Sequence, residues 1–428
     1  MLSISDIIAV LLTLCAVFGW LNHKFLRLPR SIGLLAISVG STLLLVAADM
    51  FVPGRTLYAP LEDLLRQIDF TQVVLDGMLA FLLFAGALQV DLGRLRARWM
   101  PVAVLAFVGT TLSALIIGFG FEGIALQLGA PLGLVWALLF GAIISPTDPV
   151  AVLGALANVR VPPSLEVEMQ GESLLNDGIG IVLFVLVLRF ATGHAEEVGA
   201  GALLHLIVVY ACGGAALGIV TGFIAYRLIR SIDDYPVEIM ISLALVTGTY
   251  ALAQTLQISG PLAMVSAGLL LGERGPRDAM SERTQRYLFG LWSVIDEILN
   301  SVLFLLIGLE VLVLRFEGTT LVLAALAPFL VLFARLVSLC APLVMLPFSQ
   351  AFSVKRLPVL TWGGVRGGIS VALALSIPDV PQKPIILAAT YCVVVFSVLV
   401  QASTLPIVAR ATIGPVKSPR GADEHSRN

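Results

Sequence analysis

Long apolar stretches separated by short polar breaks run through almost the whole chain. Since about 20 apolar residues cross the hydrocarbon core of a bilayer as a helix, thirteen stretches are candidate transmembrane helices. The ninth is short, and the polar break before it is nearly absent. The stretches are 6–22, 32–48, 71–90, 100–121, 131–157, 168–189, 201–226, 237–256, 259–272, 287–313, 319–347, 359–377 and 385–409. The pattern predicts an all-α polytopic membrane protein with thirteen transmembrane helices.

Composition favours the same class. Of the 428 residues, 58% are hydrophobic and only 13% are charged, whereas about 25% of the residues of a soluble domain are charged. The net charge of −2 indicates no nucleic-acid partner. The four cysteines lie in apolar segments without metal-ligand spacing, and the sequence contains no Walker A motif for ATP. We expect no cofactor, and transport driven by an ion gradient becomes the leading class.

The basic residues are distributed unevenly between the connections. When every second connection is taken, beginning with Lys24, Arg27 and Arg30, this set holds 19 of the 26 Lys and Arg, and the other set holds five. Cytoplasmic loops carry the excess of Lys and Arg. The asymmetry therefore predicts that the N-terminus lies outside and that a short tail over 411–428 lies in the cytoplasm. The membrane is expected to be the plasma (inner) membrane. The remaining two, Arg335 and Arg366, fall inside predicted spans.

Two of the predicted spans contain breaks. In the fifth, Pro146 and Pro149 remove N–H donors from the middle of the helix, and the twelfth contains the glycine-rich segment 363–368. An interrupted helix is tolerated in hydrocarbon only where it is buried in protein or lines a cavity. The alternative is an ordinary kink with close-packing glycines. Because each break also carries a charge, we favour discontinuous helices.

The two breaks lie seven spans apart, and this odd separation gives them opposite orientations in the membrane. This is the relation expected of inverted-topology repeats, here spans 1–6 against spans 8–13. Paired broken helices in such repeats indicate the binding site of a transporter.

Asp177 lies in the middle of the apolar sixth span, where a charge costs roughly 2.5–3.5 kcal/mol. Ser173 is four residues earlier and shares its helix face. With oxygens from the break near Thr147, these groups offer ligands for a small cation. A proton would compete with the cation for the carboxylate, and this competition couples two fluxes. Asn176, a neutral amide, leaves one titratable group and favours one-for-one electroneutral exchange.

Other charged residues have predicted structural roles. Glu172 is turned away from Asp177 and is expected to pair with Arg335, since an unpaired buried charge is costly. Asp148 either binds the cation or neutralises the positive N-terminal ends of the half-helices, and the sequence leaves both readings open. Arg366, beside Gly364, is expected to face the C-terminal dipole ends of its own span. For Asp76, Asp296, Glu297 and Glu310, interface snorkelling or local capping is expected instead of a transport role, and Asn300 is expected to hydrogen-bond into the core.

Several ordered motifs resemble those of the NhaP-type sodium/proton antiporters of the monovalent cation/proton antiporter superfamily, over nearly the whole membrane region. The motifs are 145–152 (Ser-Pro-Thr-Asp-Pro-Val-Ala-Val), 171–178 (Gly-Glu-Ser-Leu-Leu-Asn-Asp-Gly), 300–304 with 308–310, and 363–368. In one departure, Ala85 stands where many relatives have an acid in the third span, which puts an ion contact from that span in doubt.

The resemblance implies roles for matching residues. Asp177 with Asn176 would carry cation and proton in turn, and Thr147, Asp148 and Ser173 would surround the ion. The ion pair matched by Glu172 and Arg335 would be structural. These matched positions are the candidate site.

The resemblance also implies a homodimer that works by an elevator-like motion. Residues 1–98 and 237–315 would form the scaffold and dimerisation spans, 99–190 and 316–410 the moving core, and 191–236 the linking seventh span. The expected function is electroneutral exchange of Na⁺, or of Li⁺ or K⁺, for H⁺ by alternating access, in pH homeostasis. A K⁺/H⁺ exchanger and a cation channel or ion-sensing membrane protein are the alternatives; the chain is expected to be a transporter and not an enzyme.

Overall fold

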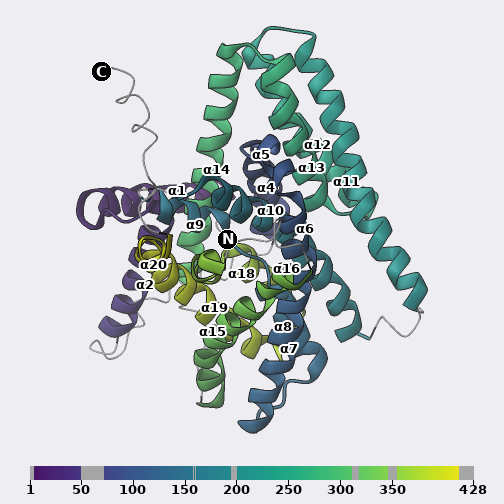
Figure 1. Cartoon of the computed structure of the whole chain (residues 1–428). Helices are drawn as coiled ribbons and strands as arrows, with labels where there is room; N and C mark the ends of the chain where they lie inside the picture. The colour runs from purple at the N-terminus through teal and green to yellow at the C-terminus, as the bar shows by residue number, and fades with distance from the viewer. Residues whose placement is uncertain are drawn as a thin grey trace, which may run out of the picture.

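The computed structural model describes residues 4–49, 72–157, 159, 161–193, 200–310, 318–345 and 354–413. These residues form helices and contain no strand (Figure 1). The α-helices are α1 (Ile4–Leu21), α2 (Arg30–Asp49), α4 (Leu79–Leu88), α5 (Leu92–Ala97), α6 (Trp99–Val104), α7 (Thr110–Gln127), α8 (Leu134–Ile144), α9 (Pro149–Leu156), α10 (Pro163–Ala191), α11 (Ala200–Arg230), α12 (Tyr235–Thr255), α13 (Gly260–Arg274), α14 (Glu282–Glu310), α15 (Gly318–Ser338), α16 (Cys340–Met345), α17 (Leu357–Trp362), α18 (Gly368–Leu375), α19 (Lys383–Phe396) and α20 (Ser403–Ile413). Single π-helical turns are present at Asn22–Leu26, Gln72–Met78, Leu105–Gly109, Gly275–Ala279 and Ser397–Ala402, and Val354–Arg356 is a 3₁₀ turn.

Among the described residues, nine helical segments are long and apolar enough to cross a membrane, and the bent pair of α8 and α9 makes a tenth. The chain is therefore a multi-pass integral membrane protein. The separation of α12 from α13, the weakest part of the predicted pattern, is present: Gln257 has a φ of 54°, and Ser259 caps α13. The full number of thirteen spans stays a prediction. The tail after residue 413, the connections with Arg55, Arg66 and Arg315, and the side chain of Asp76 lie outside the described residues.

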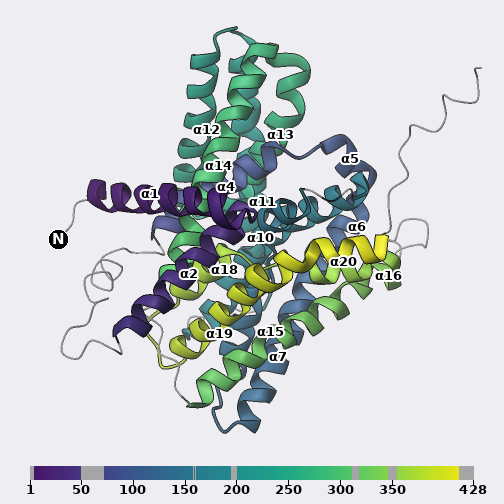
Figure 2. The same ribbon diagram turned by 90° about the vertical axis from the view of Figure 1, so that its left-hand side faces the viewer.

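The helices pack in two groups. In the first, α13 lies against α11 and α4, and α14 lies against α2; in the second, α7 contacts α8 and α15, and α15 contacts α19. Both views show α12, α13 and α14 at one end of the molecule and α7 and α15 at the other (Figures 1 and 2). The long helix α10 contacts α8 in the second group and α13 in the first, so it lies where the two groups meet.

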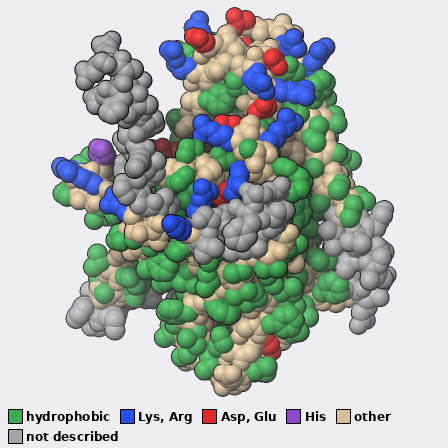
Figure 3. All heavy atoms as spheres, viewed as in Figure 1, with side chains coloured by type: hydrophobic (Ala, Val, Ile, Leu, Met, Phe, Trp, Pro, Cys, Tyr) green, Lys and Arg blue, Asp and Glu red, His purple; other side chains and the backbone are tan. Residues whose placement is uncertain are grey.

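The surface divides along the same direction. On the face in Figure 3, hydrophobic side chains cover most of the lower half, while Lys and Arg gather in the upper half. The helices α11 and α13 carry basic residues in their last turns, namely Arg227, Arg230 and Arg274. This distribution agrees with the predicted separation of basic and non-basic connections, although which end faces the cytoplasm stays a prediction.

Small residues allow α11 to approach α13 closely. A Cβ added to Gly214 would meet the backbone oxygen of Ser259, and one added to Gly218 would meet the backbone of Ala263. Helices in lipid associate largely through such close van der Waals packing, since lipid tails are as apolar as the side chains. These glycines therefore allow α11 to pack closely against α13.

The contact predicts opposite outcomes for two glycine substitutions. Gly218→Ala should destabilise the protein by about 1–3 kcal/mol, because the new methyl group overpacks the interface. The matched control is Gly248→Ala in α12, where an added Cβ meets nothing within 4 Å and should stabilise the helix by roughly 0.5–1 kcal/mol. Thermal unfolding in detergent measures both. Equal shifts for the two variants would contradict the packing argument.

Candidate functional site

The two predicted breaks lie against each other in the interior. The first separates α8 from α9, whose axes differ by 41°, and the second separates α17 from α18. The backbone N–H of Asp148 in the first break donates to the carbonyl of Val365 in the second, at 2.7 Å. Thr147 is 4% exposed and Val365 is fully buried. Two irregular segments far apart in the sequence thus share one buried site.

Charged side chains satisfy the helix ends that the first break creates. Asp148 accepts hydrogen bonds from the N–H groups of Val150, at 2.8 Å, and Ala151, at 3.3 Å, at the start of α9. Arg366 donates to the carbonyls of Ser145 and Pro146 at the end of α8. An anion at a helix N-terminus and a cation at a C-terminus both match the helix dipole.

The contacts of Arg366 and Asp148 bear on what was expected of each from the sequence. The expected partner of Arg366 was wrong, because its hydrogen bonds are made to the fifth span and not to its own. The reason is that the second break lies against the first, so the nearest free carbonyls belong to α8. For Asp148, the structure shows the capping contacts; its role as a cation ligand stays a prediction. An added Cβ on Gly367 would meet the Asp148 carboxylate, so the glycine makes room for it.

The side chains of α10 hold the first break in place. The amide of Asn176 donates from Nδ2 to Thr147 Oγ1 at 2.9 Å, and its Oδ1 accepts from the Thr147 N–H at 3.2 Å. The hydroxyls of Thr147 and Ser173 lie 2.7 Å apart. Gly180 allows Pro146 to lie directly on the helix, where a Cβ would meet the proline ring. Sequence reasoning considered Asn176 only for its charge and missed this positioning contact.

Asp177 faces a small cavity at the meeting of the two breaks. Asp177 is only 6% exposed. No described residue forms a hydrogen bond or an ion pair with its carboxylate. The cavity measures about 70 Å³ and is lined by Thr147, Asp148 and Asp177, with Ser370 from α18. Of the five predicted cation-binding residues, these three reach the cavity. Ser173 and Asn176 are not among its described lining residues; they contact Thr147 instead.

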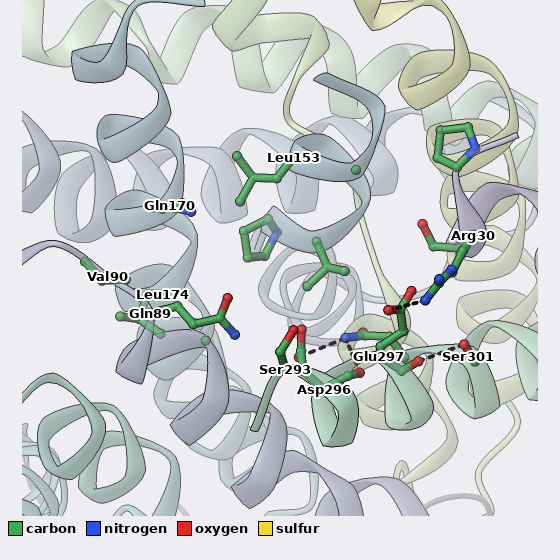
Figure 4. Close-up of a pocket in the computed structure, with 17 residues that line it drawn as sticks. Arg30, Gln89, Val90, Leu153, Gln170, Leu174, Ser293, Asp296, Glu297 and Ser301 are labelled. Atoms are coloured by element: carbon green, nitrogen blue, oxygen red, sulfur yellow. Dashed lines mark hydrogen bonds and ion pairs between the residues drawn. The ribbon is translucent and has the colours of Figure 1, made fainter. Parts of the chain in front are cut away.

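A larger vestibule adjoins this cavity. It measures about 420 Å³, and both spaces are lined by Gly86, Leu174, Asp296 and Asn300. In Figure 4, Asp296 and Ser293 project from α14 into the vestibule, while Glu297 is directed toward Arg30, with which it forms an ion pair. Asp296 was expected at an interface or a cap, and the structure places it in the wall of the site.

The third span contributes no acidic residue to the lining of the two spaces within the described chain. In α4, Leu82, Leu83 and Gly86 line the small cavity, whereas Ala85 is fully buried. The vestibule is also lined by Arg30. The vestibule therefore lies near the connection that contains Lys24, Arg27 and Arg30, one of the basic connections.

A third space lies further along α10 and α18, beyond the small cavity. It measures about 660 Å³, is lined by Arg189, Tyr210 and Gln257, and shares no lining residue with the small cavity in the described chain. Its wall includes Ile181 and Leu373. Ile181 is four residues after Asp177, and Leu373 is four residues after Ile369; Asp177 and Ile369 both line the small cavity. The buried side chains of Ile181 and Leu373 thus lie one helical turn beyond the small cavity, at the wall of the third space.

Glu172 and Arg335 form a buried ion pair on the other face of α10. Two Arg335 nitrogens reach the two Glu172 oxygens, with Nη2 to Oε2 at 2.9 Å, and Nε donates to the carbonyl of Leu360 at 3.3 Å. A Cβ on Gly364 would lie 2.9 Å from Arg335 Nε. The glycine of the second break therefore leaves room for the guanidinium.

Sequence reasoning missed a second buried acid, Glu168, which has two arginine partners. Glu168, 1% exposed, accepts from Arg98 Nε at 2.6 Å and from Arg356 Nη1 at 3.4 Å, which ties the starts of α6, α10 and α17 together. Its position one helical turn before Glu172 was the available signal.

Comparison with known proteins assigns the family. Residues 8–411 match the model of the sodium/hydrogen exchanger transmembrane family. The chain belongs to the sodium/hydrogen exchanger family. The Na(+)/H(+) antiporter NhaP of Pseudomonas aeruginosa is 41% identical over 97% of this chain and 99% of that protein. NhaH of Halobacillus dabanensis, also a Na(+)/H(+) antiporter, is 33% identical over 90% of this chain and 93% of its own.

A solved exchanger structure has the same fold. The sodium proton antiporter MjNhaP1 from Methanocaldococcus jannaschii at pH 8 matches with a TM-score of 0.74, over 96% of this chain and 99% of that one. The sequence identity is 21%. This likeness therefore concerns the exchanger fold alone.

The buried pair predicts non-additive mutational effects in this exchanger. Arg335→Ala should destabilise the protein by about 3–5 kcal/mol, because it leaves Glu172 as an uncompensated buried charge. When Glu172→Ala is added to the Arg335→Ala variant, the further loss in free energy of unfolding should be much smaller than the loss that Glu172→Ala causes in the wild-type protein. Unfolding of the two single variants and the double variant in detergent gives the coupling energy. Additive effects would show that the two charges do not stabilise each other.

Proposed function

We propose that the protein is an electroneutral secondary antiporter that exchanges one Na⁺ for one H⁺ by alternating access around Asp177. The single observation that supports it is the buried Asp177 carboxylate, which faces a cavity at two broken helices without a partner among the described residues. A lone carboxylate in a membrane is stabilised by either a cation or a proton. Since one bound charge excludes the other, the two fluxes are coupled.

The surrounding contacts support a stoichiometry of one for one. Asn176 is a neutral amide that positions Thr147, and Asp148 is engaged at the start of α9. Of the acids on α10 in the membrane interior, Glu172 is paired with Arg335. Asp177 is thus the group left to gain and lose a positive charge in each cycle.

The proposed assembly follows the two packing groups. Residues 1–98 and 237–315 form a scaffold, 99–190 and 316–410 form the core, and 191–236 link them. The close approach of the two breaks supports inverted repeats, and the end rich in Lys and Arg supports an orientation with the N-terminus outside. Thirteen spans and a location in the plasma membrane are part of the same proposal. We further propose a homodimer in which the core moves relative to the scaffold and serves pH homeostasis.

Removing the charge of Asp177 should abolish exchange. Asp177→Asn keeps the shape of the side chain but cannot bind a cation and a proton in turn, so sodium-dependent proton flux in proteoliposomes should fall to the level of empty vesicles. The matched control is Asp379→Asn, which alters an exposed carboxylate between α18 and α19 and should leave the flux unchanged. Retained exchange in a correctly inserted Asp177→Asn protein would overturn the assignment.

Electroneutral exchange predicts that voltage has no effect on the equilibrium. An imposed potential of 100 mV would change the balance by about 2.3 kcal/mol for each net charge moved. The sodium gradient at which net proton flux vanishes should therefore be the same with and without a potassium–valinomycin potential. A shift of that gradient with voltage would contradict one-for-one exchange.

The transported cation is tested by the same flux assay with Na⁺, Li⁺ and K⁺ in turn. Proton flux that responds to Na⁺ supports the proposal, and Li⁺ transport would extend it. Flux that responds to K⁺ but not to Na⁺ would identify a K⁺/H⁺ exchanger. Cation conductance without proton movement on the other side would identify a channel.

A further inference from the structure

Asp296 lies at the junction between the vestibule and the cavity of Asp177. It is one of the few residues that line both spaces, together with Asn300 one helical turn further along α14. Asp296 is on α14, which packs against α2 and α4, whereas Asp177 is on α10, which lies where the two packing groups meet and contacts both α8 and α13. A cation that moves from the vestibule to Asp177 therefore passes Asp296.

The side chain of Asp296 is held in place on one side only. Asn300 Nδ2 donates to Asp296 Oδ1 at 3.0 Å and to the Asp296 carbonyl at 2.9 Å. No described residue binds Oδ2. Because the i and i+4 side chains share a helix face, this contact directs the carboxylate along α14 toward the shared lining.

No positive group neutralises this carboxylate among the described residues. Of the charged neighbours, Arg30 of α2 pairs with Glu297 and Asp148 caps α9. Arg366 bonds through Nη1 to the end of α8, and its Nε and Nη2 are buried without a hydrogen-bond partner among the described residues. The vestibule lining also supplies neutral side-chain oxygens from Ser293, Gln89 and Asn300. Carboxylate, amide and hydroxyl oxygens are suitable ligands for a hard cation.

We propose that Asp296 is a second, transient binding residue for the transported monovalent cation, used on the vestibule side of the site. The inference rests on the proposed exchange function and goes beyond it in naming where the cation first sheds water. The independent support is Asp177 itself, a buried and unpartnered carboxylate in the wall of the same cavity. Because Asp296 belongs to α14 and not to α10, its contribution is confined to the conformation in which the vestibule is open to Asp177.

Because Asp296 would act only when the vestibule is open to Asp177, its substitution should affect transport from one side of the membrane only. In proteoliposomes with a uniform orientation, Asp296→Asn should raise the KM for Na⁺ added on the vestibule side by about tenfold, the factor that corresponds to roughly 1.4 kcal/mol. The KM for Na⁺ added on the opposite side, and the maximal rate at saturating Na⁺, should change little. Asp296→Glu should restore most of the affinity, and Asp296→Ser should behave like Asp296→Asn.

The matched control is Glu297→Gln, the next residue on α14. Its carboxylate also lines the vestibule but is already neutralised by Arg30, so the KM for Na⁺ should change far less. An unchanged KM in Asp296→Asn, or an equal increase from both sides with a loss of thermal stability, would overturn this inference while wild-type exchange stands. An absence of exchange in the wild-type protein would instead overturn the proposed function, and the inference with it.

Discussion

The site depends on one constraint: a helix broken inside a membrane must find partners for its freed backbone groups. In this exchanger the partners come from the second broken helix and from charged side chains at the break. Asp148 caps the start of α9, Arg366 reaches back to the end of α8, and the two breaks share a backbone hydrogen bond between Asp148 and Val365. Neither break could remain buried alone, because each would leave polar groups without partners at a cost of several kcal/mol.

Because these contacts engage the nearby charges, Asp177 stands apart from the other acids of the same helix. Glu168 lies between two arginines and Glu172 is paired with Arg335, so their charges are balanced within the protein. The Asp177 carboxylate has no such partner among the described residues. A group of this kind in a low-dielectric interior is stable only when it binds a positive charge. The proposed role of Asp177 in binding Na⁺ and H⁺ in turn rests on this lack of a partner.

The spaces around Asp177 are unequal. The 70 Å³ cavity shares lining residues with the vestibule of about 420 Å³. It shares none of its described lining residues with the third space, which is lined by the buried Ile181 and Leu373. In this conformation the vestibule and the cavity of Asp177 share the lining residues Asp296 and Asn300 of α14.

The sequence alone determined the membrane class, the positions of most helices and the two breaks, because lipid leaves few solutions for an apolar chain and proline and glycine have strong local effects. It also singled out Asp177, since a charge in an apolar stretch is conspicuous. Only the tertiary structure decided that Arg366 serves α8, that Asn176 holds Thr147, and that Asp296 lies in the wall of the site. Periodicity tells which residues share a helix face, but the partner of that face depends on how helices cross and rotate. That choice is made by side-chain packing between segments far apart in the chain.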